Sequence, residues 1–420
     1  MKLSHLTLAA TATAVNAAYN GDIVYYWVET SAQLVNGTLG SGLQSPPSAW
    51  FPAIVQGAVY QAAVKAKKEP LDVQQLAVSH AAHDALLWVF HGTRLYNPIN
   101  AALRSVIPAI GLDPNSPKGK NAVKIGREAA VKVAQARAAD KITNFVDFVY
   151  GPQNVGVYQQ TPGSQPLPDT PQARYVTPFA GLGDISKFRA PPPPKTNSKA
   201  YEEDLLFVKE YGSLNSTKRS QYDTDTAYFW LESSVTGWNR FAGAVVGDRF
   251  KTKVVDSAKF WAQLNYALAN AAFAAWDTKY HYNAWRPVTA IHYPGVWVHS
   301  GKSVTDPNWT PLLRPTPSHP DYPSTHSTFG GAAALVIKEV LNKGKDTLNP
   351  PATLSSTVSL DNRGVITRTY TKLSDAVLKN SKSRVFGGIH FGFAGTAGNA
   401  LGETVAKETL KKFDAHWDKF

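Results

Sequence analysis

The chain of 420 residues contains no cysteine, and its single methionine is Met1. The absence of cysteine excludes disulfides, a thiolate nucleophile and metal sites with cysteine ligands. Without cysteine or internal methionine, the body of the chain has no sulfur that can be oxidised. This composition fits an oxidising environment or an enzyme that produces an oxidant, and neutral drift gives the same pattern.

Long apolar runs and clustered charge are also missing. No segment reaches about 18 consecutive apolar residues, so we expect no transmembrane helix and no stable membrane association. The formal net charge is +12, but the sequence has no run of five Lys/Arg and no zinc-finger signature. Because the charge is dispersed, it indicates solubility or an anionic ligand, and we expect no nucleic-acid partner.

The N-terminus, MKLSHLTLAATATAVNAAYN, has a positive start, a short apolar run and small residues at a plausible cleavage position. This pattern predicts a signal peptide over residues 1–18 and a secreted, extracellular protein, with an ordinary N-terminal segment as the alternative. Glycosylation sequons begin at Asn36, Asn215 and Asn308, which agrees with a secreted glycoprotein, although such triplets also arise by chance.

Apolar residues at helical spacing dominate the first part of the chain. Residues 50–92 predict two helices separated at Pro70, and residues 119–151 predict one long helix or two. Residues 152–198 are rich in proline and lack periodicity, so we expect a long connection on the surface.

The second half of the chain is helical again. Residues 256–287 carry small and aromatic side chains all round, which predicts a helix buried on most faces, and strand patterns are scarce. We therefore predict an all-α fold of two packed helical bundles. The N-terminal half spans 19–151, the connection 152–198, and the C-terminal half 199–420 forms one integrated catalytic domain.

Three stretches place polar groups in otherwise apolar sequence: KYHYNAWRP at 279–287, HPDYPSTHSTFGG at 319–331 and SRVFGGIHFGF at 383–393. Each is weak alone, because Ser324 can be a helix N-cap and a lone histidine can belong to a core. Together they supply the groups that hold and act on a tetrahedral oxyanion, namely Lys279, Arg286, Ser324, His326, Arg384 and His390.

The pattern K-x6-RP, then PS-x-H, then SR-x5-H resembles the three-part signature of the type 2 phosphatidic acid phosphatases and vanadium-dependent haloperoxidases. Within that superfamily, AAWDTKYHYNAWRPVTAI and HPDYPSTHSTFGGAA resemble the haloperoxidase branch. The resemblance implies an all-α fold with two four-helix bundles and vanadate bound in the core of the second.

The resemblance also implies a role for each matched residue. His390 would bond to vanadium, and His326 would be the acid–base group for hydrogen peroxide. Lys279 would polarise the peroxide so that halide attacks it and leaves as hypohalous acid. The vanadate oxygens would be contacted by Lys279, Arg286, Arg384, the hydroxyl of Ser324 and the backbone N–H of Thr325.

Four positions qualify the resemblance. Thr325 replaces a glycine that is usual in the family, and Ala394 stands where an aspartate often supports the histidine equivalent to His390. In the implied halide pocket, Trp276 matches a tryptophan of fungal chloroperoxidases. His319 stands where those enzymes carry phenylalanine and algal bromoperoxidases carry histidine, which favours bromide over chloride.

Several other polar residues are candidates for supporting roles. The acid–base histidine should have an acidic partner, for which Asp225 and Glu232 are candidates. Asp277 and Asp321 flank the motifs and could pair with the cations. Three further residues, His80, His83 and Asp84, lie on a predicted helix. They either pack in the core or form a metal site.

Three functions fit these observations. The first is a secreted haloperoxidase that binds vanadate and uses hydrogen peroxide, halide and small organic substrates. The second is an acid phosphatase of the same superfamily with His390 as nucleophile. The third is a non-catalytic secreted helical protein with a degenerate pocket. The sequence leaves the oligomeric state open, homo-oligomers included.

Overall fold

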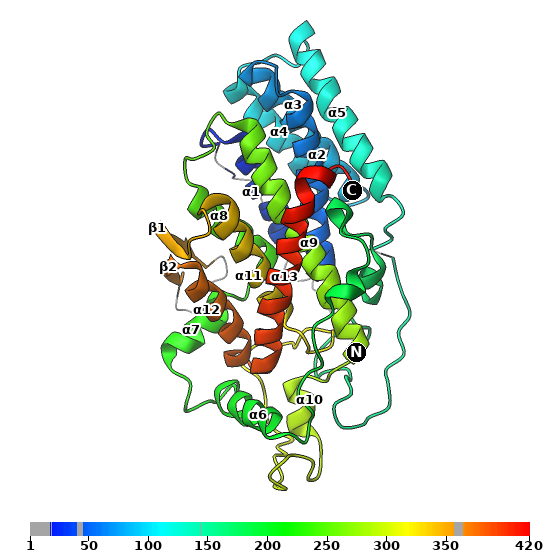
Figure 1. Ribbon diagram of the computed structural model, residues 1–420, viewed down its shortest axis with the longest axis vertical. Coiled ribbons are helices and arrows are strands. Elements are labelled where there is room, and N and C mark those ends of the chain that lie inside the picture. The colour runs from blue at the N-terminus through cyan, green and yellow to red at the C-terminus, as the bar shows by residue number, and fades with distance from the viewer. Residues whose placement is uncertain (1–16, 18, 40–44, 143, 357–363) are drawn as a thin grey trace, which may run out of the picture. The chain divides into compact units, whose positions relative to one another are not determined.

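The computed structural model describes residues 17, 19–39, 45–142, 144–356 and 364–420. The expected signal peptide over 1–18 lies almost wholly outside the described residues. Apart from one two-stranded sheet, the regular elements that the structure describes are helical, which confirms the all-α prediction (Figure 1). None of the described helices is both long and apolar enough to cross a membrane.

The chain forms two compact units. The first unit takes its residues from 1–43, 54–135 and 250–258. The helices that supply it, wholly or in large part, are α1 (Ile23–Leu39), α2 (Ser45–Lys65), α3 (Leu71–Val89), α4 (Tyr96–Ile110) and α5 (Pro117–Arg137). The two helices predicted around Pro70 are thus confirmed.

The helix predicted over 119–151 is too long, because α5 ends at Arg137. Lys141 has a left-handed φ of 51°, which a continuing α-helix does not allow. The Asp140 carboxylate accepts the indole N–H of Trp50 at 2.5 Å and lies 3.1 Å from Arg137 Nε. These side-chain bonds fix a turn where periodicity alone predicted more helix.

The second unit contains 44–53, 136–249 and 259–420. Its helices are α6 (Lys199–Tyr211), α7 (Gln221–Phe229), α8 (Ser234–Val246), α9 (Val254–Tyr282), whose first residues are assigned to the other unit, α10 (Pro287–His292), α11 (Thr325–Val336), α12 (Leu373–Phe386) and α13 (Gly392–His416). Shorter turns complete it: η2 (Pro171–Tyr175), η3 (Phe179–Gly181), η4 (Ile185–Phe188) and the π-turn η5 (Ile337–Leu341).

The α9 helix is buried on most faces, as its composition predicts. Trp261, Trp276 and Lys279 all have 0% exposure. The helix carries Lys279 in its last turn, where the helix dipole favours a cation. The first charged residue of the motif set is therefore fully buried.

The helices α11 and α13 cross at very short distance and lie side by side in Figure 1. A Cβ atom added at Gly402 would lie 1.9 Å from the Thr328 carbonyl oxygen, and one at Gly331 would lie 2.1 Å from that of Asn399. Only glycine allows this approach. The crossing fixes the start of α11 against the start of α13, and both carry motif residues.

The connection over 152–198 is not simply a surface segment, as was expected. Tyr158 and Phe179 have 0% exposure. The main-chain oxygen of Asp169 accepts hydrogen bonds from Trp276 Nε1 at 2.9 Å and the Tyr280 hydroxyl at 2.7 Å. Buried aromatic residues and main-chain acceptors therefore make this proline-rich segment part of the second unit's core.

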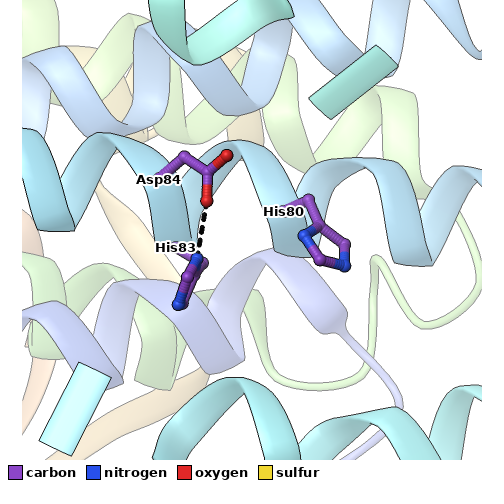
Figure 2. Close-up of side chains that lie close together, drawn as sticks. All are labelled: His80, His83 and Asp84. Atoms are coloured by element: carbon purple, nitrogen blue, oxygen red, sulfur yellow. Dashed lines mark hydrogen bonds and ion pairs between the residues drawn. The ribbon is translucent and has the colours of Figure 1, made fainter. Parts of the chain in front are cut away.

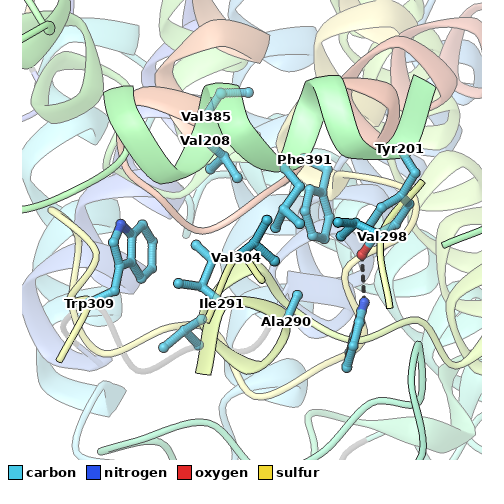
Figure 3. Close-up of a cluster of buried hydrophobic side chains, with 12 residues drawn as sticks. Tyr201, Val208, Ala290, Ile291, Val298, Val304, Trp309, Val385 and Phe391 are labelled. Carbon is cyan, nitrogen blue, oxygen red and sulfur yellow. Dashed lines mark hydrogen bonds between the residues drawn. The ribbon is translucent and has the colours of Figure 1, made fainter. Parts of the chain in front are cut away.

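A buried cluster fixes α6 against α10 and the loop that follows it (Figure 3). Tyr201, Val208 and Ile291 lie in it, together with Phe391 at the start of α13. The indole N–H of Trp285 donates to the Tyr201 hydroxyl in the same cluster. The residue next to Arg286 is thereby anchored in apolar packing.

A small antiparallel sheet was not predicted. The strands β1 (Thr347–Ser355) and β2 (Thr367–Lys372) pair with Ala352 opposite Tyr370. Two prolines inside β1 hide the alternating pattern of a strand, as is typical of an edge strand.

Candidate active site

The three motifs lie at helix ends in the second unit. Lys279 is in the last turn of α9, Arg286 is the N-cap of α10, and Ser324 is the N-cap of α11. Arg384 is in the last turn of α12, and His390 lies in the short segment before α13. All five are at most 3% exposed, so the site is buried and contains three basic side chains.

The Arg286 guanidinium joins the three motifs. Its Nε donates to the His319 carbonyl oxygen at 2.8 Å, and its Nη1 donates to that of Ile389 at 2.7 Å. The same Nη1 lies 3.0 Å from His390 Nε2, and Nη2 lies 3.0 Å from His319 Nδ1. The structure therefore brings these residues together as the motif pattern predicts.

Lys279 holds the loop that precedes α11. Its Nζ donates to the carbonyl oxygens of Pro320 at 2.7 Å, Asp321 at 3.1 Å and Pro323 at 2.5 Å. Burial, and then the charge of Arg286, lower the pKa of Lys279 well below its ordinary value. The three ammonium protons thus have acceptors within the protein, and we name this arrangement the Lys279 carbonyl clamp.

Unpartnered donors lie at the start of α11 and on Arg384. The buried Ser324 hydroxyl and Arg384 Nε have no hydrogen-bond partner among the described residues. The main-chain N–H groups of Thr325, His326 and Ser327 also have no hydrogen-bond acceptor among the residues that the structure describes. Burial lowers the pKa of Arg384 to about 9, and Arg286 adds to this effect.

This donor set fits a tetrahedral oxyanion. Helix N-terminal N–H groups and a serine hydroxyl bind anions, and a guanidinium adds a charge-assisted hydrogen bond. Buried donors without acceptors are rare in folded proteins and call for a ligand or an ordered water. Vanadate would satisfy the Ser324 hydroxyl, Arg384 Nε and the N–H of Thr325.

The partner of His326 differs from the prediction. Its Nε2 lies 3.2 Å from the main-chain oxygen of Glu232, not from a carboxylate. The Glu232 carboxylate accepts from Arg240 at 2.6 Å, and Asp225 accepts from a glutamine side chain at 2.8 Å. His326 is partly exposed, and desolvation together with Arg384 lowers its pKa well below the ordinary value.

The two residues expected in a halide pocket are adjacent. The rings of Trp276 and His319 have centroids 4.9 Å apart at an interplanar angle of 49°. Both side chains are buried, and burial followed by the charge of Lys279 lowers the pKa of His319 well below its ordinary value. Lys279 Nζ lies 5.8 Å from the Trp276 ring centroid.

Asp321, which was expected to pair with the cations, also contacts His390, which the sequence did not indicate. Its Oδ1 lies 2.8 Å from His390 Nδ1 and 3.9 Å from Arg286 Nη1. Asp277, the other acidic residue flanking the motifs, instead pairs with Arg189 at 2.7 Å. An aspartate inside the apolar HPDYPS stretch was the available signal, but sequence does not show which side chain it meets.

A separate group lies on α3 in the first unit (Figure 2). His83 Nδ1 bonds Asp84 at 2.7 Å, and His83 Nε2 lies 3.1 Å from the Asn100 side-chain oxygen. Neither ring nitrogen of His80 has a hydrogen-bond partner among the described residues. Arg127 lies 3.7 Å from Asp84, and a cation beside the carboxylate favours core packing over a metal site.

The buried His80 gives a testable pH dependence. Burial lowers its pKa from 6.5 to about 4, with Asp84 opposing and His83 and Arg127 reinforcing the shift. Between these values the unfolded chain binds more protons, so the free energy of unfolding falls as the pH is lowered. At about 1.4 kcal/mol per pH unit, the loss reaches about 3 kcal/mol by pH 4.

Chemical denaturation between pH 7 and pH 4 measures this loss. We expect His80→Gln to flatten the curve, whereas His91→Gln, at an exposed histidine, should leave the slope as it is in the parent. Equal slopes for the parent and His80→Gln would contradict the assignment.

Comparison with known proteins agrees with this geometry. Residues 259–419 match the family described as VCPO second helical-bundle domain. The chain is 26% identical over 306 residues to the vanadium chloroperoxidase of Curvularia inaequalis, covering 57% of this chain and 50% of that one. It is 33% identical over 99 residues to the vanadium-dependent bromoperoxidase of Ascophyllum nodosum, covering 23% of this chain and 18% of that one.

Solved structures show the same fold over nearly the whole chain. A bacterial vanadium-dependent iodoperoxidase has a TM-score of 0.75 at 19% identity, covering 94% of this chain and 97% of the other. A holo-type bacterial vanadium-dependent chloroperoxidase has a TM-score of 0.73 at 16% identity, covering 97% and 100%. The chain spans half or less of the length of the two curated relatives. Residues 259–419 therefore match the VCPO second helical-bundle domain, and the chain has the fold of the vanadium-dependent haloperoxidases.

Proposed function

We propose that the protein binds vanadate and uses hydrogen peroxide to oxidise halide to hypohalous acid. The observation that carries this proposal is the set of unpartnered donors at Ser324, Arg384 and the start of α11, next to buried cations and His390. The relation to proteins named vanadium chloroperoxidase and vanadium-dependent bromoperoxidase supports it.

Bound vanadate supplies a Lewis acid that activates peroxide. The Ser324 hydroxyl, the Thr325 N–H and Arg384 hold the oxyanion, and Arg286 and Lys279 add positive charge without losing their protein acceptors. The neutral ring of His390 offers a nitrogen lone pair to the same site.

His326 is suited to move the proton of hydrogen peroxide. It is partly exposed, so water and peroxide reach it. Because its pKa lies well below the ordinary value, the ring is unprotonated near pH 7 and accepts a proton first. The main-chain oxygen of Glu232 orients the ring through Nε2.

The proposal extends to bromide and to secretion. The pair of Trp276 and His319 carries the bromide preference, because His319 presents a polar ring where a phenylalanine would be apolar. The N-terminal sequence and the exposed sequon residues Asn215 and Asn308 support an extracellular glycoprotein. The organic acceptors of the oxidised halide are small molecules.

An acid phosphatase is the second candidate, favoured by the contact between Asp321 and His390 at 2.8 Å. A carboxylate beside a histidine supports its use as a nucleophile toward phosphorus. Phosphate and vanadate share tetrahedral geometry, so the same donors would hold either anion.

One experiment separates the two candidates. The purified protein is stripped of anions, and portions are reloaded with orthovanadate or phosphate. Each portion is assayed for bromination of a phenol dye with hydrogen peroxide and bromide, for the same reaction with chloride, and for hydrolysis of nitrophenyl phosphate. We expect bromination only after vanadate loading, faster with bromide than with chloride, and absent from His390→Ala.

Two other results would change the assignment. Phosphate-ester hydrolysis that vanadate inhibits, without bromination, would establish the phosphatase. A folded protein with neither activity would reject both enzymes and direct attention to the unusual Thr325.

A further inference from the structure

We propose that Asp321 is a positioning residue that keeps the proton of His390 on Nδ1 and the lone pair on Nε2, the nitrogen nearer to Arg286 Nη1. The inference deepens the proposed function and rests on it for the identity of the anion. His390 and Asp321 are 2% and 0% exposed, and Nδ1 lies 2.8 Å from Oδ1. The contact is a close ion pair and not an aligned hydrogen bond, because neither carboxylate oxygen of Asp321 has a hydrogen-bond partner among the described residues.

The neighbours of the two ring nitrogens favour the same tautomer. Arg286 Nη1, which is only a donor, lies 3.0 Å from His390 Nε2 and 3.4 Å from Nδ1, so Nε2 is the better placed acceptor. The ring proton then belongs on Nδ1, which faces a carboxylate oxygen. In the opposite tautomer, the N–H on Nε2 would point at the guanidinium, and the carboxylate would face a nitrogen without a proton. The partner of one ring nitrogen thus determines which nitrogen carries the proton.

The main chain delivers the carboxylate to this position. The Asp321 N–H donates to the Ala284 carbonyl oxygen at 2.9 Å. On the other side, the Lys279 carbonyl clamp binds the carbonyl oxygens of Pro320 and Asp321 itself. The aspartate is therefore held by α9, through Lys279, and by the segment that follows this helix, through Ala284.

No other carboxylate takes this role in the described part of the chain. Ala394, four residues after His390, has no acceptor on its side chain, and its main-chain oxygen already accepts from Ser324 N–H at 2.8 Å. Asp321, which comes from the loop before α11, is the carboxylate paired with His390. A partner that orients a liganding histidine is typically worth 10–100-fold in affinity or activity, which sets the expected effect at about that range.

The test reads the ring directly by NMR of protein labelled with ¹⁵N in the histidine imidazoles. Loss of signals in His390→Gln assigns the ring. In the parent we expect an Nδ1–H, bare Nε2 tautomer with a strongly downfield Nδ1 proton. In Asp321→Ala we expect a mixture or the reverse tautomer, and in the isosteric Asp321→Asn an upfield shift of that proton.

The matched control is Asp169→Asn. Asp169 is also buried, at 9% exposure, and burial raises its pKa to about 7, as it does that of Asp321. No ion pair or hydrogen bond joins it to His390 among the described residues, so its replacement should leave the His390 signals in place. Calorimetry with orthovanadate should show binding about 10–100-fold weaker for the Asp321 variants than for this control.

A parent ring protonated on Nε2 would overturn the proposal, and so would His390 signals that both Asp321 variants leave unchanged. If Asp321→Ala does not fold, the proton shift in Asp321→Asn decides alone. The NMR experiment uses the protein without anion or turnover. A correct tautomer in a protein that does not brominate would therefore reject the haloperoxidase and leave the role of Asp321 intact.

Discussion

Replacing Arg384 with glutamine is expected to weaken orthovanadate binding by about 100-fold and to lower vanadate-dependent bromination at limiting vanadate in proportion. Arg384 is 3% exposed, its Nε has no partner among the described residues, and its Nη1 is 3.2 Å from the Trp230 carbonyl oxygen. A hydrogen bond to a charged group is worth about 1.5–3 kcal/mol, and the upper value corresponds to about 100-fold. Calorimetric titration with orthovanadate measures the change.

The stability of the same variant should move in the opposite direction. Arg384 lies in the field of Arg286, and its own pKa falls to about 9, so its charge is unfavourable while no anion is bound. We expect the melting temperature of anion-free Arg384→Gln to equal or exceed that of the parent. Normal vanadate binding by this variant would place the oxyanion site elsewhere.

Arg137→Gln is the matched control for a buried arginine outside the site. Arg137 is 1% exposed, lies 3.1 Å from Asp140 and is stacked 3.7 Å from the centroid of the Phe179 ring. Its loss should lower the melting temperature, since it leaves a partly buried carboxylate without its cation. Vanadate affinity of the folded protein should stay unchanged.

Gly402→Ala is expected to lower the free energy of unfolding by more than about 3 kcal/mol. The new Cβ would lie 1.9 Å from the Thr328 carbonyl oxygen, which is a main-chain atom and cannot rotate away. Overpacking of a core costs about 1–3 kcal/mol when side chains can adjust, and a main-chain clash costs more. Because α11 carries Ser324 at its N-cap, vanadate affinity should fall with the stability.

Gly237→Ala provides the comparison. Gly237 is also helical, but the nearest atoms to its added Cβ, in Glu232, are 3.4 Å away. Alanine in a helix is favoured over glycine by about 1 kcal/mol, so this variant should be as stable as the parent or slightly more stable. Chemical denaturation of Gly402→Ala and Gly237→Ala measures the two free energies of unfolding. Equal stability of the two variants would show that α11 and α13 can move apart to admit the new Cβ.

The motif residues could be predicted because their chemistry demands particular side chains. Lysine, two arginines, a serine and histidines have few replacements in an oxyanion site, and the structure places Lys279, Arg286 and His390 within one hydrogen-bonded group. Carboxylates are different, since many of them lie on ordinary surfaces. Asp277 and Asp321 were indistinguishable in sequence, and only the fold directs one to Arg189 and the other to His390.

The fold followed the same division. Helical spacing predicted α2, α3 and the buried α9, because a periodic apolar face has to be covered. The end of α5 and the sheet of β1 and β2 depend on contacts between distant residues, such as Trp50 with Asp140 or Ala352 with Tyr370. Local pattern carries no information on such pairs, and His326 likewise acquired a main-chain acceptor that no side-chain search could reveal.

Because the Lys279 carbonyl clamp lies wholly within the protein, we expect folding and anion loading to be two separate events. The Lys279 ammonium group already has three protein acceptors, so the chain does not need the anion in order to arrange this loop. Binding of the anion then orders few residues, so the loss of conformational entropy lowers the affinity only slightly. The anion-free protein should therefore remain folded. Its activity should appear when the anion is supplied and disappear when the anion is removed, without new synthesis or refolding.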